Sequence, residues 1–279
     1  MMLSIFPAVA LLLAAQVAHA DTIDRIRESG TIRLAHRTDA APFASLDAAG
    51  QAVGYSVELC RRVADAIKAS MPERTLTMQF VPVTALDRFE AITQGRADLL
   101  CEATTVTLGR REQLDFSLYT YVTGAGVIVR RGAPTTAILQ GPRTVGVLRG
   151  TTTETAMRRL AANPGARLTL LPVETHDVAI GALRSRQIDA YVADRELLTQ
   201  MLAARGNPAD ILIADDFLTL ETYALAMRRG EDRLRLIADR TLAGLYRSGE
   251  ILEVFRRSMP TPEPSTTVRL LYGLQALAE

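Results

Sequence analysis

Short apolar runs alternate with longer amphipathic stretches along most of this 279-residue chain. The apolar runs are rich in Val, Ile, Leu, Thr and Tyr, which predicts strands at 31–35, 76–83, 97–101, 144–148, 168–173, 188–193 and 210–214. The other stretches repeat apolar residues at three- and four-residue steps, which predicts helices at 55–71, 85–92, 152–162, 178–184, 195–204 and 232–247. This alternation predicts an α/β fold with parallel sheets covered on both faces.

Two β-like runs are longer than the others, and they lie at 119–132 and 220–230. Each ends in Arg-Arg-Gly, and the segment between them has its own alternation of strands and helices. We therefore expect the chain to leave one domain near 120–124 and to return near 219–223. Two such crossings would form a hinge with a cleft between two lobes.

We therefore expect the chain to form a discontinuous first lobe, 21–121 and 222–279, and an inserted second lobe, 122–221. Near the C-terminus, a Pro-rich break precedes the segment 267–279. That segment has the pattern of a short amphipathic helix, and we expect it to dock back onto the first lobe.

Residues 1–20 differ from the rest of the chain because they contain no charged residue and an apolar stretch at 5–17. Small residues in Ala18-His19-Ala20 predict a signal peptide that is cleaved after Ala20, leaving Asp21 as the mature N-terminus. The segment lacks the usual Lys or Arg before the apolar stretch, so an uncleaved membrane anchor is the alternative. Later stretches are too short and too polar to span a bilayer.

The composition argues against several classes of function. With 32 Lys and Arg against 31 Asp and Glu, the net charge of +1 gives no electrostatic footprint for nucleic acid or an anionic membrane. The chain has no Trp and 5% aromatic residues, which argues against base stacking. It also lacks a G-x-S-x-G motif, and the mature histidines, His36 and His176, have no neighbouring Cys at metal-ligand spacing. We therefore expect no metal and no cofactor.

Two cysteines, Cys60 and Cys101, leave two possibilities open. In an oxidising compartment they can form a disulfide. However, two isolated cysteines are no disulfide framework, and Cys60 falls on the apolar face of a predicted helix, so a buried free thiol is the simpler interpretation.

Polar residues follow the predicted strands where helices begin, which is where open α/β sheets hold their ligands. The stretch CEATTVTLGRREQ sets Thr104 and Thr105 just after a strand and Arg110 a few residues later. Hydroxyls followed by fixed positive charge predict a site that holds an anion. Taken singly, a threonine before a helix is explained as an N-cap. No nucleophile accompanies these residues, so the pattern favours binding over catalysis.

Five stretches give the chain a family resemblance: SGTIRLAHRTDAAPFA, VGYSVELCRRVADAI, ADLLCEATTVTLGRREQLDFS, VLRGTTTETA and TLETYALAMRRGED. In order and spacing they resemble the periplasmic solute-binding proteins of polar amino-acid ABC transporters (family 3), most closely the glutamate/aspartate-binding branch. The resemblance extends over almost the whole mature chain. It implies two α/β lobes joined by hinge strands, a periplasmic location, an amino-acid ligand and an ABC permease in the inner membrane as partner. We expect a monomer.

The resemblance also implies roles for particular residues. Arg110 matches the arginine that grips the ligand α-carboxylate, helped by Thr105, and the backbone amides of Thr151 and Thr152 complete this anion site. Asp194 matches the carboxylate that takes the α-ammonium, together with the main-chain carbonyl of Ala103. The residues that match those recognising a side-chain carboxylate in the acidic branch are Arg37, Arg88 and His176. Their positive charge would favour glutamate or aspartate.

The chain departs from that branch at three positions. Ala85 and Ala103 stand where the branch has serines, and Glu102 replaces a small residue beside the pocket. A carboxylate at Glu102 would either repel an acidic ligand or pair with an arginine. It also keeps open an enzyme alternative, because cyclohexadienyl dehydratases resemble this family and use a pocket acid. A periplasmic sensory domain is the third possibility.

Overall fold

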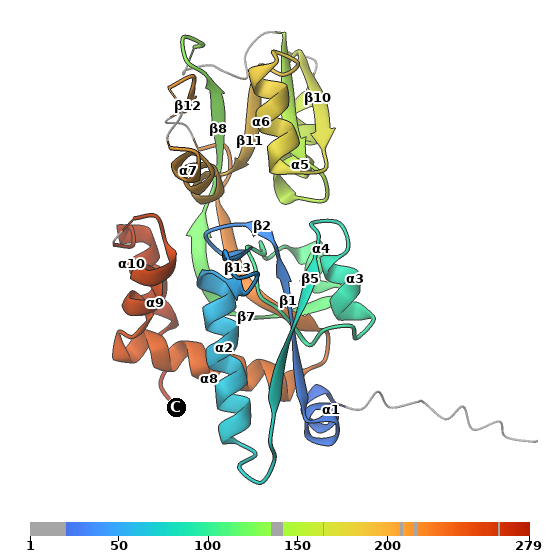
Figure 1. Ribbon diagram of the computed structural model, residues 1–279, viewed down its shortest axis with the longest axis vertical. Helices are drawn as coiled ribbons and strands as arrows, with labels where there is room; N and C mark the ends of the chain where they lie inside the picture. The colour runs from blue at the N-terminus through green and yellow to red at the C-terminus, as the bar shows by residue number, and fades with distance from the viewer. Residues whose placement is uncertain (1–20, 135–141, 164, 207–208, 215–216, 262) are drawn as a thin grey trace, which may run out of the picture.

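The computed structural model describes residues 21–134, 142–163, 165–206, 209–214, 217–261 and 263–279. It contains two lobes that lie one above the other, each built around a five-stranded sheet (Figure 1). The predicted signal peptide, residues 1–20, lies outside the described residues. Over the part of the chain that is described, no helix has both the length and the apolar character needed to cross a membrane.

The first lobe is formed by two parts of the chain. The N-terminal part contains α1 (Thr22–Ser29), β1 (Thr31–Arg37), β2 (Asp39–Ala40), β3 (Ala44–Leu46), β4 (Ala52–Val53), α2 (Tyr55–Ala69), β5 (Thr77–Val83), α3 (Arg88–Thr93), β6 (Leu99–Leu100), α4 (Leu108–Arg111) and β7 (Leu114–Thr123). The C-terminal part adds β13 (Glu221–Arg228), α8 (Asp232–Ser248), α9 (Ile251–Ser258) and α10 (Thr266–Gln275). The large sheet has the order β5-β1-β6-β13-β7, and β2, β3 and β4 form a small separate sheet.

The second lobe is continuous in sequence. It contains β8 (Ala125–Arg130), β9 (Arg143–Leu148), α5 (Thr152–Ala161), β10 (Leu168–Val173), α6 (His176–Arg184), β11 (Ala190–Asp194), α7 (Arg195–Ala204) and β12 (Ile211–Ile213). Its sheet has the order β10-β9-β11-β8-β12. The two-lobed α/β fold predicted from the sequence is therefore confirmed.

The prediction of purely parallel sheets is wrong for part of each sheet. Strands β5, β1 and β6 run parallel, as do β10, β9 and β11. In contrast, β13 is antiparallel to β6 and β7, and β8 is antiparallel to β11 and β12. The exceptions involve the strands at the lobe crossings, which no crossover helix joins to their neighbours, so the βαβ rule does not fix their direction.

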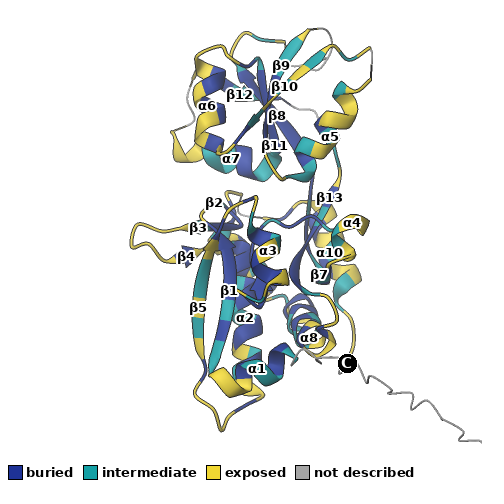
Figure 2. Ribbon diagram, turned by 90° about the vertical axis from the view of Figure 1, so that its right-hand side faces the viewer, coloured by how far each residue is buried: buried dark blue, intermediate teal, exposed yellow. Residues whose placement is uncertain are grey.

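Both faces of each sheet are buried. Successive strand residues point to opposite sides of the sheet, so neighbouring residues belong to different apolar clusters. In the first lobe, Leu34 packs into one apolar cluster and Ala35 into another. In the second lobe, Tyr191 and Val192 divide in the same way. Figure 2 shows buried strands inside each lobe and exposed outer faces on the helices.

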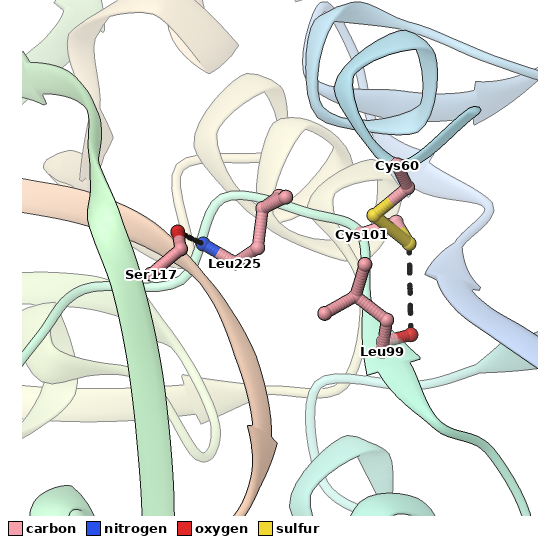
Figure 3. The surroundings of a disulfide bond; sticks show 5 residues. All are labelled: Cys60, Leu99, Cys101, Ser117 and Leu225. Carbon is pink, nitrogen blue, oxygen red and sulfur yellow. Dashed lines mark hydrogen bonds between the residues drawn. A yellow bond between two sulfur atoms is a disulfide. The ribbon is translucent and has the colours of Figure 1, made fainter. Parts of the chain in front are cut away.

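Cys60 and Cys101 form a disulfide with a Cα–Cα distance of 5.9 Å, so the interpretation of Cys60 as a buried free thiol is wrong. It joins the middle of α2 to the residue after β6 (Figure 3). Beside it, Ser117 Oγ of β7 accepts a hydrogen bond from the backbone N–H of Leu225 in β13, at 3.1 Å. The disulfide thus holds the start of the loop that leads to Arg110.

The chain passes between the two sheets at Gly124, which lies between β7 and β8. A Cβ atom at this position would lie 2.0 Å from the Thr219 carbonyl oxygen of the returning chain, so this close approach requires glycine. The Ala125 N–H also donates to Thr219 Oγ1 at 2.8 Å. The two crossings therefore lie against each other.

The C-terminal helix α10 packs on the first lobe, as its amphipathic pattern predicted. The Tyr272 and Tyr55 hydroxyls lie 2.7 Å apart, and Gln275 Oε1 accepts a hydrogen bond from the Tyr119 N–H at 2.7 Å. Tyr119 belongs to β7, so α10 braces the strand that leaves the first lobe.

Candidate functional site

A small cavity lies between the lobes, and its lining includes every site residue that the sequence predicted: Arg37, Arg88, Ala103, Thr105, Arg110, Thr151, Thr152, His176 and Asp194. Leu148, Thr153, Val192, Ala193 and Leu197 complete the lining, and the sequence reasoning did not select them. The cavity measures about 20 Å³, little more than one water molecule needs. An amino acid can enter it only when the lobes separate or lining side chains shift.

The site is built from the carboxyl ends of strands and the helix starts that follow them. Strand β1 ends at Arg37, β6 leads to Ala103 and Thr105, and β11 ends at Asp194. Helix α3 begins with Arg88 and α6 with His176. Because parallel strands bring their carboxyl ends to one edge of a sheet, the local pattern gathers these side chains at the cleft.

The lobes touch across the cleft beside Arg88. Its Nη2 donates to the Gly150 carbonyl oxygen of the second lobe at 3.0 Å. Gly150 has a φ of +74°, and a Cβ atom there would lie 3.0 Å from the Ala85 carbonyl oxygen. A side chain at Gly150 would thus be strained and would press against the first lobe.

Arg110 is held in a fixed orientation. Thr107 caps α4 by accepting a hydrogen bond from the Arg110 N–H at 3.1 Å, and Arg110 Nη1 donates to the Thr105 carbonyl at 2.6 Å. The guanidinium carbon lies 4.7 Å from the centre of the Phe89 ring. No carboxylate among the described residues forms an ion pair with Arg110. Its fork of N–H donors is therefore suited to an incoming carboxylate.

The N-terminus of α5 faces the same cavity. Thr151 Oγ1 accepts a hydrogen bond from the Glu154 N–H at 3.1 Å and donates to the Leu148 carbonyl at 2.7 Å, so capping occupies this hydroxyl. The first N–H groups of a helix have no intrahelical acceptor and favour anions. Thr151 and Thr152 can therefore contribute backbone amides, as the resemblance implies.

Asp194 is half-buried within a group of polar side chains that spans both lobes. The Tyr223 hydroxyl of β13 donates to Asp194 Oδ2, and Thr153 Oγ1 donates to Asp194 Oδ1 at 3.3 Å. Burial of the carboxyl group, followed by the nearby carboxylates of Glu221 and Glu196, raises the pKa of Asp194 to about 7. An ammonium group placed against Asp194 would favour its ionised form.

Glu221 is a prominent polar residue of this region that the sequence reasoning missed. Its Oε2 accepts hydrogen bonds from Thr105 of the first lobe and Thr152 of the second, and its Oε1 accepts one from Thr219 at 2.9 Å. Glu221 is the first residue of β13, so it couples the returning crossing to both walls of the cleft. An ionisable residue at the start of the second long β-like run was the available signal.

Glu102 lies behind the cavity lining, between Arg37 and Arg88. Its Oε1 is 3.1 Å from Arg88 Nε and accepts a hydrogen bond from Thr104 Oγ1 at 2.6 Å. Its Oε2 is 3.9 Å from Arg37 Nη1. Of the two outcomes expected for this carboxylate, the structure therefore shows pairing with arginine.

His176 meets Arg37 across the cleft, with 3.4 Å between His176 Nε2 and Arg37 Nη2. Its Nδ1 lies 2.7 Å from the Tyr191 hydroxyl. Burial, followed by the charge of Arg37, lowers the pKa of His176 to about 4, so the ring is neutral near pH 7.

The three residues expected to recognise a side-chain carboxylate thus lie together, but they do not present uncompensated positive charge. Arg37 is also 2.8 Å from Asp39 Oδ1. Burial opposes the charged form of Arg37, and the carboxylates of Glu102 and Asp39 outweigh it and raise the pKa.

The arrangement can hold a small zwitterion, with Arg110 and the α5 amides for a carboxylate and Asp194 for an ammonium. Over the described residues, no three His, Cys, Asp or Glu side chains gather as they would around a metal ion. Two lobes, paired crossings and a polar cleft together define a protein that encloses a small solute.

The sequence profile of the bacterial extracellular solute-binding proteins, family 3, matches residues 32–260, so the chain belongs to this family. It is 27% identical to the L-glutamate/L-aspartate-binding protein of Pseudomonas aeruginosa, over 95% of this chain and 90% of that protein. It is 29% identical to a glutamate/glutamine/aspartate/asparagine-binding protein of Rhodobacter capsulatus, over 97% of this chain and 80% of that one. These relatives and the family are solute-binding proteins, not enzymes.

Solved structures agree with the fold. The cysteine-binding protein of Campylobacter jejuni superposes with a TM-score of 0.75, at 21% identity, over 88% of this chain and 96% of that one.

Proposed function

We propose that this protein captures a free L-amino acid in the periplasm and delivers it, as a monomer, to the permease of an inner-membrane ABC importer. The family is one of bacterial extracellular solute-binding proteins, and a relative from Rhizobium johnstonii, 27% identical, is named a general L-amino acid-binding periplasmic protein. The observation that carries the proposal is Arg110, a half-buried residue without an ion-pair partner among the described residues, whose side chain lines the same cavity as Asp194. An α-amino acid carries a carboxylate that can pair with Arg110 and an ammonium group that can pair with Asp194.

Glutamate and aspartate, with their amides, are the candidate ligands. The Pseudomonas relative is named for glutamate and aspartate, and the Rhodobacter relative for these two acids and their amides. We assign the α-carboxylate to Arg110, Thr105 and the amides of Thr151 and Thr152. Asp194 and the Ala103 carbonyl take the α-ammonium, and the side chain extends toward Arg37, Arg88 and His176.

We propose that the first lobe, 21–121 and 222–279, and the second lobe, 122–221, move as units. The small cavity supports this, because separation of the lobes would give an amino acid the room that the closed cavity lacks. Glu221 supports it as well, since its bonds to Thr105 and Thr152 form only when the walls meet.

The enzyme alternative has less support, because its candidate acid, Glu102, already forms an ion pair with Arg88 and accepts a hydrogen bond from Thr104. A sensory role uses the same binding step, so the ligand test applies to it as well.

A thermal-shift panel of the twenty amino acids plus prephenate and arogenate tests the proposal on ligand-free refolded protein. A ligand at about 100 times its Kd adds about 2.7 kcal/mol, a shift of roughly 5 °C or more. We expect such a shift with at least one of glutamate, aspartate, glutamine and asparagine. A shift with prephenate alone, followed by its conversion, would establish the enzyme instead.

A further inference from the structure

We propose that Glu102 makes the side-chain end of this pocket accept a carboxamide at least as well as a carboxylate, so that glutamine or asparagine is a full ligand. We call this end, formed by Arg37, Arg88 and His176 with Glu102 behind them, the side-chain subsite. The inference rests on the amino-acid binding proposed above and names the residue that sets the ligand range.

The first support is the balance of charge in the side-chain subsite. Arg37 is paired with Asp39 at 2.8 Å and with Glu102 at 3.9 Å, and Arg88 is paired with Glu102 at 3.1 Å. His176 is neutral near pH 7 because its pKa is about 4. Two arginines therefore face two carboxylates, and no excess positive charge is left to attract a ligand carboxylate. Such a group would instead lie close to the like charge of Glu102, which weakens binding.

The second support is a pair of buried atoms without hydrogen-bond partners. Among the described residues, Arg88 Nη1 has no acceptor and Glu102 Oε2 has no donor, although Arg88 is 2% exposed and Glu102 is 1% exposed. A carboxamide offers one oxygen acceptor and an NH₂ donor, so it can satisfy both atoms once the lobes separate or the lining side chains shift to admit the ligand. A carboxylate offers acceptors alone and leaves Glu102 Oε2 unsatisfied.

Glu102 is also held in place, so it cannot readily move aside for an acidic ligand. Its neighbour Cys101 is tied to α2 by the disulfide, and its own Oε1 is bonded to the Thr104 hydroxyl at 2.6 Å. The negative charge of Glu102 is thus a fixed part of the side-chain subsite. It disfavours ligands with a side-chain carboxylate by repulsion.

Calorimetric titration of glutamine and glutamate into ligand-free protein tests the proposal with three proteins: the wild type, Glu102→Gln and Glu73→Gln. Glu102→Gln keeps the shape and the Oε1 acceptor but removes the charge. Glu73 is an exposed carboxylate just before β5, at the end of that strand away from the cleft, and serves as the charge-matched control. We expect the wild type to bind glutamine at least as tightly as glutamate. In Glu102→Gln, the ratio of the two affinities should shift toward glutamate by about tenfold or more, and in Glu73→Gln it should not change.

A wild type that binds glutamate more tightly than glutamine would overturn the proposal, and so would an unchanged ratio in Glu102→Gln. If Glu102→Gln fails to fold, as judged by circular dichroism, the wild-type ratio alone decides. Failure of both ligands and of every other amino acid to bind the wild type would instead refute the amino-acid function itself.

Discussion

Removal of the disulfide should destabilise the protein by an amount that follows from its place in the chain. Cys60 and Cys101 are both fully buried and are separated by 41 positions in sequence. In the chain-entropy description, a cross-link that closes a loop of about 40 residues lowers the conformational entropy of the unfolded chain by roughly 13 cal/mol/K. This destabilises the unfolded state by about 4 kcal/mol at 25 °C. We therefore expect the double variant Cys60→Ala/Cys101→Ala to lose about that much stability.

Thermal unfolding followed by circular dichroism measures the loss. For a chain of this size, 1 kcal/mol corresponds to roughly 2–4 °C, so Tm should fall by roughly 8–16 °C. A reductant should lower the Tm of the wild type toward that of the double variant and leave the variant unchanged. Equal Tm values for the oxidised wild type and the double variant would refute the reasoning, as would two free thiols in the protein secreted under oxidising conditions.

Three further predictions concern the ligand cycle and the mature chain. Because the pKa of Asp194 is raised to about 7 and an ammonium binds its ionised form, affinity should be full above that pH and should fall about tenfold per pH unit below it. Asp194→Asn should bind weakly at every pH, and an affinity that is constant from pH 5 to 8 would contradict the assignment. Solution scattering should give a smaller radius of gyration with saturating ligand, and an unchanged radius would count against lobe closure. Intact-mass analysis of the secreted protein should begin at Asp21, whereas a membrane-bound product that retains Met1 would show an uncleaved anchor.

The periodic patterns predicted the long helices and most strands, because these elements bury one face or both and therefore have apolar residues at regular spacing. Helices α1, α4 and α9 and the small sheet β2-β3-β4 were missed. Each is short, so the apolar pattern spans too few residues to stand out. The periodic pattern could not predict the direction of the strands at the crossings either. That direction depends on where the chain returns rather than on any local feature.

The gathering of these residues around one cavity could be predicted because strand ends and helix starts converge in α/β sheets, and Arg37, Arg110 and Asp194 all occupy such places. Glu221 and Tyr223 come from a crossing strand, whose position beside the cleft depends on the arrangement of both lobes. Glu102 was recognised as unusual, but its partners were not. Which arginine a carboxylate meets is decided by side-chain placement, and sequence spacing does not contain that information.

The role of Arg110 is the centre of this account, since every amino acid carries the α-carboxylate that it is proposed to hold. The most direct measurement is calorimetric titration of the tightest ligand from the thermal-shift panel into the wild type, Arg110→Ala and the control Arg111→Ala. Arg111 is exposed, and its guanidinium carbon lies 5.5 Å from the centre of the Phe116 ring, so its loss leaves the cavity intact.

Truncating one partner of a buried, hydrogen-bonded charge pair costs roughly 2–5 kcal/mol, so Arg110→Ala should lower the affinity about 30-fold to several-thousand-fold. Arg111→Ala should bind within about threefold of the wild type, as expected for an exposed substitution within about 0.5 kcal/mol. Tight binding by a folded Arg110→Ala, or a greater loss in Arg111→Ala than in Arg110→Ala, would contradict the assignment of the α-carboxylate to Arg110.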